Sequence, residues 1–337
     1  MLINRRNKKN IKVPELKINE EIMEEVHQMV CLGDVFNSKG NNDDLINDRV
    51  KRGTASMVSI HGFMREMSLG VHTISVYLLL HHAIFLASML FNAQAWSNIT
   101  EKNMSNLTTI QMRFLKKAMS AKQATTNSFM YLELGVLPIA QEVHKRQLTF
   151  FHHIVNLTED DPVRKMWQYQ RQLPNYNNWW NGIENLIAKY NIELSEEQIK
   201  SISKDTFKQK VKKAITQVAF EDLRKECQAK EKTKQLVYQE YKTQPYIQSL
   251  YPNHSKIIFK CRSQTLNIKQ HMRYEYKDNL FCRWCGISDE TLQHIVNCGF
   301  SGPVINSVDK ILQECNDMKQ LKEIAQRIES FLERIDV

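Results

Sequence analysis

Apolar residues recur at three- and four-residue spacings between Leu45 and Leu157, and this helical periodicity is the strongest constraint on the fold. The stretches that fit helices in this way are 45–61, 72–91, 100–119 and 139–157. Glycine and proline, on which the frequent turns of β-rich folds depend, number only 10 and 7 among 337 residues. The sequence therefore predicts a mainly α-helical protein.

Further helix signals lie in the second half of the chain. Ser195 and Gln198 have the spacing of a capping box, and the lysine-rich stretch after them is expected to stay helical to about Tyr241. Residues 304–335 are expected to form one amphipathic helix, because their apolar residues share a single stripe. A short segment near the N-terminus, 30–36, is β-like instead.

The longest apolar stretch, 74–91, is interrupted by His81, His82 and two serines. Because the sequence has no unbroken run of 18 apolar residues, we expect no ordinary membrane span and no membrane partner. The helix over 72–91 is apolar nearly all round, so we expect it at the centre of the core. The basic, polar N-terminus lacks the apolar segment of a secretory signal, which predicts an intracellular protein, nuclear or cytoplasmic.

Positive charge is concentrated in one part of the chain. The whole sequence has a net charge of +9, while 200–280 alone contains 18 lysines and arginines against 8 acidic residues. A basic block in an otherwise neutral protein indicates a polyanionic partner. A solvated helix face with a chance excess of lysine is the alternative, and composition leaves the two open.

One cluster has the spacing of metal ligands, C-x2-C-x8-H-x3-C, and consists of Cys282, Cys285, His294 and Cys298. The first two cysteines can grip one ion from a tight turn, in which Gly286 permits a positive φ. Ser288 is expected to cap a helix that presents His294 and Cys298 on one face. Three sulfurs and one imidazole nitrogen close a tetrahedron, which suits one structural Zn²⁺ per chain and leaves no coordination position for catalysis.

The alternative is that the three cysteines belong to a core by coincidence. Cys261, His254 and His271 lie close upstream and stay open as substitute ligands, with packing or surface roles as the expectation. Adjacent histidine pairs elsewhere, at 81–82 and 152–153, are not expected to share a metal, because neighbouring side chains diverge on a helix.

The segment from Glu290 to His294, Glu-Thr-Leu-Gln-His, leads into Cys298 and resembles the C-terminal zinc knuckle of non-LTR (LINE-type) retrotransposon reverse transcriptases. Two upstream segments are similar to parts of the same polyproteins. Residues 31–33 read Cys-Leu-Gly where the family commonly has Tyr-Leu-Gly, and 132–139 has the family's E-L-G-x-x-P pattern.

This resemblance covers about 26–157 and 256–300, and it implies the thumb, the linker and the knuckle of such a polymerase. The implied order is a disordered basic N-terminus (1–25), a thumb-like helical bundle (26–158), a basic helical linker or insertion (159–255), a small zinc-knuckle module (256–300) and an amphipathic C-terminal helix (301–337).

Polymerase chemistry needs carboxylates that hold two magnesium ions, and in this family they lie in a palm that would precede Val30. The two Asp-Asp pairs in the chain, 43–44 and 160–161, have the surroundings of caps or loops. We therefore expect no catalytic residue in this chain.

The resemblance also favours nucleic-acid contact for the basic block, mostly to phosphates and with little sequence readout. Trp179 and Trp180 are either a stacking platform for bases or anchors of a small core. The residues expected to contact RNA or DNA are Lys208, Lys210, Lys212, Lys213, Arg224, Lys225, Lys230, Arg262, Lys269, Arg273, Arg283 and Trp284.

The first functional hypothesis is a nucleic-acid-binding C-terminal portion of a reverse transcriptase, which grips template RNA or target DNA without a polymerase site of its own. The second is the tail of an active RNA-directed DNA polymerase whose palm is either missing from the sequence as given or supplied by another polypeptide. The third is a zinc-binding adaptor derived from a transposable element, with the helix 304–335 as its protein contact. An intramolecular cap on the knuckle is the competing role for that helix.

Overall fold

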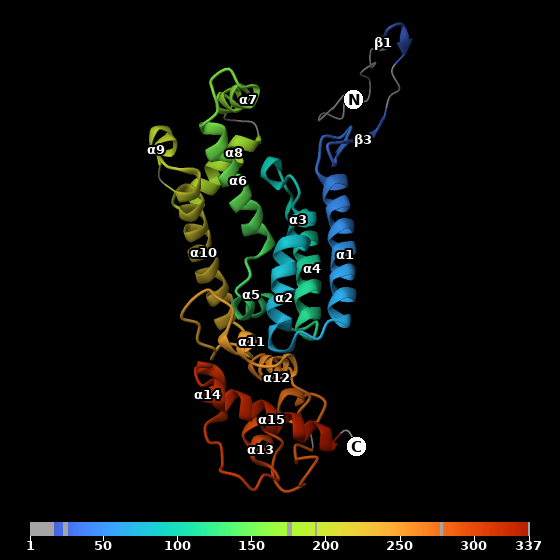
Figure 1. Cartoon of the computed structure of the whole chain (residues 1–337), viewed down its shortest axis with the longest axis vertical. Coiled ribbons are helices and arrows are strands. Elements are labelled where there is room, and N and C mark those ends of the chain that lie inside the picture. The colour runs from blue at the N-terminus through green and yellow to red at the C-terminus, as the bar shows by residue number, and fades with distance from the viewer. Residues whose placement is uncertain (1–16, 23–25, 174–176, 193, 277–278, 336–337) are drawn as a thin grey trace. The chain divides into compact units, whose positions relative to one another are not determined.

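The computed structural model describes residues 17–22, 26–173, 177–192, 194–276 and 279–335, and it is mainly α-helical, as the periodicity predicts (Figure 1). The rest of the expected disordered N-terminus, 1–16 and 23–25, lies outside the described residues.

The chain divides into two compact units, each assembled from three segments. Unit 1 comprises Met1–Ser56, Ile84–Ile110 and Ile139–Ile215, and unit 2 comprises Met57–Ala83, Gln111–Pro138 and Thr216–Val337. Three long helices contribute residues to both: α1 (Asp43–Glu66), α4 (Glu101–Ala118) and α10 (Lys204–Gln228). The linear domain division implied by the resemblance stays a prediction.

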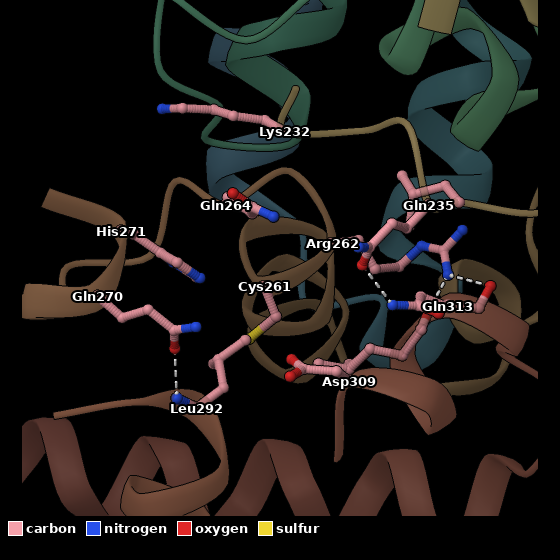
Figure 2. Close-up of a pocket in the computed structure, with 12 residues that line it drawn as sticks. Lys232, Gln235, Cys261, Arg262, Gln264, Gln270, His271, Leu292, Asp309 and Gln313 are labelled. Atoms are coloured by element: carbon pink, nitrogen blue, oxygen red, sulfur yellow. Dashed lines mark hydrogen bonds between the residues drawn. The ribbon is translucent and has the colours of Figure 1, made fainter. Parts of the chain in front are cut away.

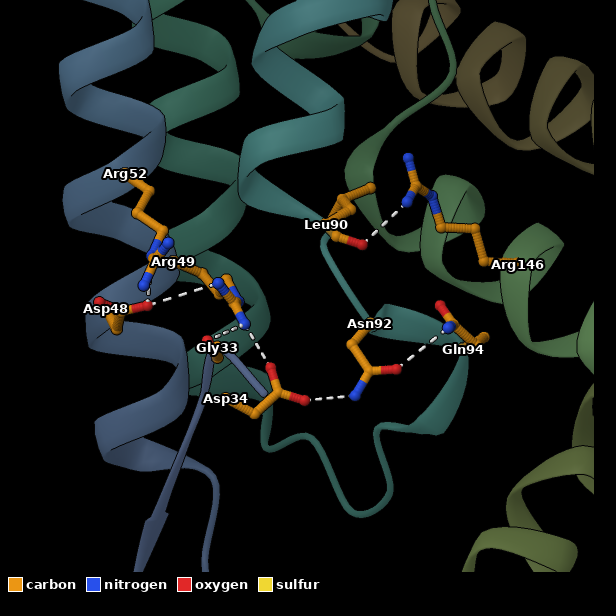
Figure 3. A network of polar contacts seen from close by, with 9 residues as sticks. All are labelled: Gly33, Asp34, Asp48, Arg49, Arg52, Leu90, Asn92, Gln94 and Arg146. Carbon is orange, nitrogen blue, oxygen red and sulfur yellow. Dashed lines mark hydrogen bonds and ion pairs between the residues drawn. The ribbon is translucent and has the colours of Figure 1, made fainter. Parts of the chain in front are cut away.

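Unit 1 begins with two short antiparallel hairpins, the second of which lies where the sequence is β-like. Its turn consists of Leu32 and Gly33, both with positive φ, as a two-residue hairpin connection requires. Asp34, directly after the turn, accepts hydrogen bonds from the buried Arg49 and from Asn92 (Figure 3). The strands of the hairpins are β1 (Lys17–Ile18), β2 (Glu21–Ile22), β3 (Gln28–Cys31) and β4 (Asp34–Asn37).

The helical part of unit 1 is organised around α6 (Ile139–Val155), which contacts every other helix named in this paragraph, α3 through a hydrogen bond from Arg146 to the carbonyl of Leu86. Phe151 on α6 packs against Trp167 and Trp180 with ring centroids 5.8 and 5.4 Å away, which joins three helices in one aromatic cluster. Of the two alternatives for the tryptophan pair, this contact favours the core anchor for Trp180. The helices around α6 are α3 (Leu86–Met89), η3 (Ala93–Ala95), α7 (Pro162–Arg171), α8 (Trp179–Lys189) and α9 (Glu196–Ser201).

In unit 2 the C-terminal helix α15 (Met318–Ile335) buries its apolar stripe against the helices α11–α14 (Figure 1). The side chains of Leu321, Ile324, Ile328 and Phe331 are all fully buried. The apolar stripe is therefore not free for contact with another protein, and the adaptor hypothesis stays a prediction for the other faces of this helix. The helices of unit 2 are η1 (Gly70–His72), α2 (Thr73–Leu80), α5 (Asn127–Leu134), α11 (Pro245–Ser249), α12 (Pro252–Arg262), η4 (Lys269–Met272), α13 (Leu292–Asn297), α14 (Val308–Glu314) and α15.

Two predicted helix boundaries are wrong. The single helix expected over 304–335 is two helices, α14 and α15, because Cys315 takes a left-handed conformation and Asp317 caps the next helix start. The lysine-rich helix ends at Gln228, and turns follow it. The helix expected over 72–91 is confirmed as a continuous helical stretch, in which a π-helical segment, His81–Phe85, lies between α2 and α3.

The stretch Gly70–Met89 is long and apolar enough to cross a membrane: an 18-residue window within it has a mean hydropathy of 1.5, and only 22 % of that window is buried. It is thus not the central core helix that its composition predicts. One helix of this kind is weak evidence for a membrane span, since core helices of soluble proteins pass the same test. The expectation that the chain has no membrane-spanning segment stays a prediction.

Two buried histidines in unit 2 lie against the ring of Phe114, His61 at 5.1 Å and His81 at 5.2 Å between ring centroids. Burial lowers the pKa of His81 to about 3, with the neighbouring His82 as a smaller cause. Burial likewise lowers the pKa of His61 to about 4, and Lys117 and Arg65 add to the effect. Both side chains are therefore neutral in the folded protein at neutral pH.

The free energy of unfolding is expected to decrease as the pH falls below 6.5. The unfolded chain then binds a proton at His81 that the folded chain rejects, which destabilises the fold by about 2–3 kcal/mol at pH 4.5. The measurement is the denaturation midpoint between pH 7.5 and 4.5. His81→Phe should flatten the pH dependence by up to one proton, whereas a change at the exposed neighbour, His82→Gln, should not. Equal pH dependence in all three proteins would contradict the prediction.

Candidate metal centre and nucleic-acid interface

The four predicted ligands come together in unit 2, with donor atoms that all lie within 4.8 Å of one another. The Sγ atoms of Cys282 and Cys298 are 3.9 Å apart, and Cys285 Sγ lies 3.3 Å from His294 Nε2. A tetrahedral zinc ion with bonds of about 2.3 Å to sulfur and about 2.0 Å to nitrogen places its ligand atoms roughly 3.5–3.8 Å apart. The donor set and its spacing therefore fit a metal ion.

A tight turn holds the first two ligands. The N–H of Gly286 donates to the carbonyl of Cys282 at 2.9 Å, and the N–H of Cys282 donates to the carbonyl of Ser288 at 2.7 Å. Backbone N–H groups of Trp284 and Ile287 point at the sulfurs of Cys282 and Cys285, each at 3.4 Å. Such N–H···S contacts favour thiolate over thiol. This turn is the local geometry that the C-x2-C spacing predicts.

The other two ligands are held differently from the prediction. The helix α13 is capped by Thr291, whose hydroxyl accepts from the N–H of His294 at 3.1 Å, and not by Ser288. Cys298 follows the last residue of α13 with extended backbone, so His294 and Cys298 do not share a helix face. Glu290, which would lie in the first turn of the predicted helix, precedes α13 and binds other groups instead.

Glu290 ties the turn to the preceding segment. Its buried carboxylate accepts from the backbone N–H groups of Arg283 at 2.9 Å and Lys269 at 3.1 Å, and from the Arg283 guanidinium at 2.6 Å. Burial raises the pKa of Glu290, but these hydrogen bonds lower it by more. The net pKa lies below its usual value, so the carboxylate stays ionised. Sequence reasoning missed that Glu290 binds Arg283 and Lys269. The available signal was the Glu-Thr-Leu-Gln-His segment, which begins with this residue.

The C-terminal helix α15 also contacts the segment that contains the Cys282 cluster. The guanidinium of Arg334 lies 5.3 Å from the ring of Trp284 and 5.1 Å from that of Phe300. Arg327 donates to the carbonyl of Pro303 at 2.9 Å and lies over the same Phe300 ring. These contacts are the intramolecular cap that competes with the adaptor hypothesis.

The protonation of the cysteines differs across the cluster. Backbone N–H groups of Ile287 and Ser288 lower the pKa of Cys285 to about 6, whereas burial and the two neighbouring cysteines raise that of Cys298 to about 12. A divalent cation bound by all four residues would displace the remaining thiol protons, because metals bind cysteine as thiolate.

The three upstream candidates for substitute ligands are not part of this cluster. His254 Nε2 contacts Glu329 at 3.0 Å, and Cys261 and His271 line a separate cavity of about 150 Å³ beside Arg262 (Figure 2). Burial raises the pKa of the Cys261 thiol far above neutrality, so it is no nucleophile there. Among the described residues, the Cys282 cluster is the one group that could hold a metal ion.

Two expected nucleic-acid contacts are wrong because the structure buries them. Arg262 is fully buried and pairs with Glu133 at 2.8 Å, and its guanidinium also donates to the carbonyls of Leu312 and Gln313 (Figure 2). Lys269 is buried and donates to Asn279 at 3.2 Å. Neither cation reaches a phosphate at the surface.

Two more of the expected contact residues already have partners within the chain. Arg283 forms an ion pair with Glu290, and the ring of Trp284 lies against the Arg334 guanidinium. The remaining candidates are solvent-exposed. In unit 1 these are Lys208, Lys210, Lys212 and Lys213, and in unit 2 they are Arg224, Lys225, Lys230 and Arg273.

Comparisons of the chain with protein families, with characterised protein sequences and with solved structures find no match. The class of the protein is therefore defined by its own features, a mainly α-helical fold and a possible Cys₃His metal centre.

Proposed function

We propose that this chain binds nucleic acid as the C-terminal portion of a LINE-type reverse transcriptase, through the exposed lysines of α10 and beside a structural zinc knuckle. The supporting observation is the state of Lys208, Lys210, Lys212 and Lys213. All four are exposed, and within the part of the chain that the structure describes none has a carboxylate at ion-pair distance.

Clustered cations without internal partners repel one another, and this repulsion is relieved when a polyanion binds. Contacts of this kind go to phosphates and release the counterions condensed on the nucleic acid. Affinity should therefore decrease steeply as salt concentration rises, with little dependence on base sequence.

The proposed zinc is structural. Four protein ligands saturate a tetrahedral ion, so no coordination position remains for water or substrate. The role we assign to the ion is to fix the turn 282–288 and α13, and with them Arg283 and Trp284, against α15.

The test is the affinity for a structured RNA across a salt series. Lys210→Gln, Lys212→Gln and Lys213→Gln together should reduce the slope of log K against log salt concentration by about 2, since each lost phosphate contact removes about 0.7–0.9. The matched control is Lys310→Gln, Lys319→Gln and Lys322→Gln, an equal charge change at exposed lysines of α14 and α15. Absence of binding at low salt, or a slope that is the same in both triple variants, would reject the proposal.

A further inference from the structure

Unit 1 contains a cavity of about 350 Å³ that no sequence pattern indicates. It is lined by residues from α6, from the start of α10 and from η3, segments that lie about 50 residues or more apart in the sequence. A volume of this size is ordinary for a small-molecule site and too small for a duplex. The lining residues are Gln94, Lys145, Arg146, Thr149, Phe150, His153, Lys204 and Lys208, with no carboxylate among them.

The cations around this cavity differ in how far they are already engaged. Arg146 donates to the carbonyl of Leu90 at 2.8 Å (Figure 3), and Lys145 pairs with Glu142 at 2.6 Å. Lys204 and Lys208 stand one helical turn apart, are both exposed, and have no ion pair among the described residues. Like charges at this spacing destabilise a helix unless an anion lies between them.

The N-terminus of α10 strengthens this preference for an anion. Lys204 is the first residue of a 25-residue helix, whose dipole adds positive potential at this end. The carboxylate of Glu142 is already paired with Lys145, and Asp205 is the neighbour of Lys204 in the sequence.

An aromatic ring forms the apolar part of the lining. The ring of Phe150 meets that of Trp179 edge to face, with centroids 5.9 Å apart and an interplanar angle of 77°. Trp179 is itself held, because its Nε1–H donates to the carbonyl of Gln94 at 2.9 Å. His153 lies 5.9 Å from the same Phe150 ring. These contacts fix the orientation of Phe150 before any ligand arrives.

We propose that this cavity takes one nucleotide of a single strand, with the base stacked on Phe150 and a phosphate held by Lys204 and Lys208. An aromatic face beside cations is the arrangement by which proteins bind unpaired nucleotides, since every base has a π-face and the phosphate carries the charge. A paired base offers no free face of this kind. The inference rests on the proposed function and gives it a strand preference.

The test uses a short single-stranded RNA that contains 2-aminopurine, and a duplex of the same length. Phe150→Leu should weaken single-strand binding about tenfold or more and abolish the quenching of 2-aminopurine fluorescence, with duplex affinity changed less than about twofold. Lys204→Gln with Lys208→Gln should weaken single-strand binding more than the matched change Lys319→Gln with Lys322→Gln on α15. An abasic strand should bind wild type and Phe150→Leu equally.

Two outcomes separate this inference from the proposed function. If wild type binds neither strand at low salt, the proposed function fails and the inference fails with it. If wild type binds in a salt-dependent manner but Phe150→Leu and the Lys204/Lys208 double variant keep wild-type single-strand affinity and quenching, the inference is overturned and the function stands. Because Phe150 is partly buried, Phe150→Leu could fold poorly. The lysine variant then decides the matter, together with wild type itself, which should bind the abasic strand more weakly than the intact one.

Discussion

Removal of the proposed zinc ion is expected to unfold the segment from Cys282 to Cys298. The only helix of this segment, α13, has six residues, of which three are buried: Leu292, Ile295 and Val296. So little buried surface cannot fix the turn alone, whereas structural zinc contributes about 10–16 kcal/mol of apparent binding free energy at neutral pH. We expect one zinc ion per chain and, after chelation, loss of hydrogen-exchange protection over 280–300.

The variant that tests this is Cys282→Ser with Cys285→Ser, which should lose both the metal and the protection. Cys31→Ser is the matched control, because Cys31 is exposed and lies outside the cluster. Acidification should release the metal, since protons compete with it for the thiolates and the imidazole. Protein purified without chelator that holds no metal, or a double variant with wild-type metal content, would show that the three cysteines are only core residues.

The clustering of Cys282, Cys285, His294 and Cys298 could be predicted from the sequence because its geometry is local. The turn between Cys282 and Cys285 involves four residues, and the distance to His294 and Cys298 is covered by one short helix. The cap was misplaced because a serine followed by acidic residues is a generic helix start. Only the structure shows that Glu290 is used by Arg283 and Lys269 instead.

Buried charge, in contrast, could not be located from the sequence. Arg262 and its partner Glu133 are 129 residues apart, and no periodic pattern connects them. By charge alone Arg262 resembles the exposed lysines of α10, which is why the sequence predicts that it contacts a phosphate of the nucleic acid. The break between α14 and α15 had a signal in Asp317, a good cap, but an apolar stripe running across it outweighed that signal.

The E-L-G-x-x-P segment, 133–138, lies against a segment more than 100 residues further along the chain, and Gly135 permits this close approach. Gly135 has a φ of 61°, and a Cβ there would meet the backbone N of Thr243 at 2.3 Å. This close approach lets the carbonyl of Glu133 accept from the N–H of Gln244 at 2.9 Å and that of Leu134 accept from the Thr243 hydroxyl at 2.9 Å. The glycine thus brings a distant segment onto the end of α5.

Tyrosines complete the surroundings of the Glu133 carboxylate. The hydroxyls of Tyr238 and Tyr246 donate to its two oxygens, each at 2.6 Å, while the Arg262 guanidinium approaches at 2.8 Å. Burial, with the adjacent Glu133 charge, raises the pKa of both tyrosines well above its usual value, so both hydroxyls remain donors. Although burial opposes its charge, Glu133 keeps the pKa of Arg262 high.

Glu133→Ala is therefore expected to lower the free energy of unfolding of unit 2 by about 3–5 kcal/mol, the usual effect of leaving a buried charge without its partner. Glu231→Ala, which removes an exposed ion pair with Lys234, should change it by less than about 1 kcal/mol. The measurement is hydrogen-exchange protection of α5 and α12 together with denaturant midpoints. Because two hydroxyls also lose their acceptor, Glu133→Leu with Arg262→Met should recover only part of the loss unless Tyr238→Phe and Tyr246→Phe are added. A Glu133→Ala protein as stable as wild type would mean that water or another group satisfies Arg262.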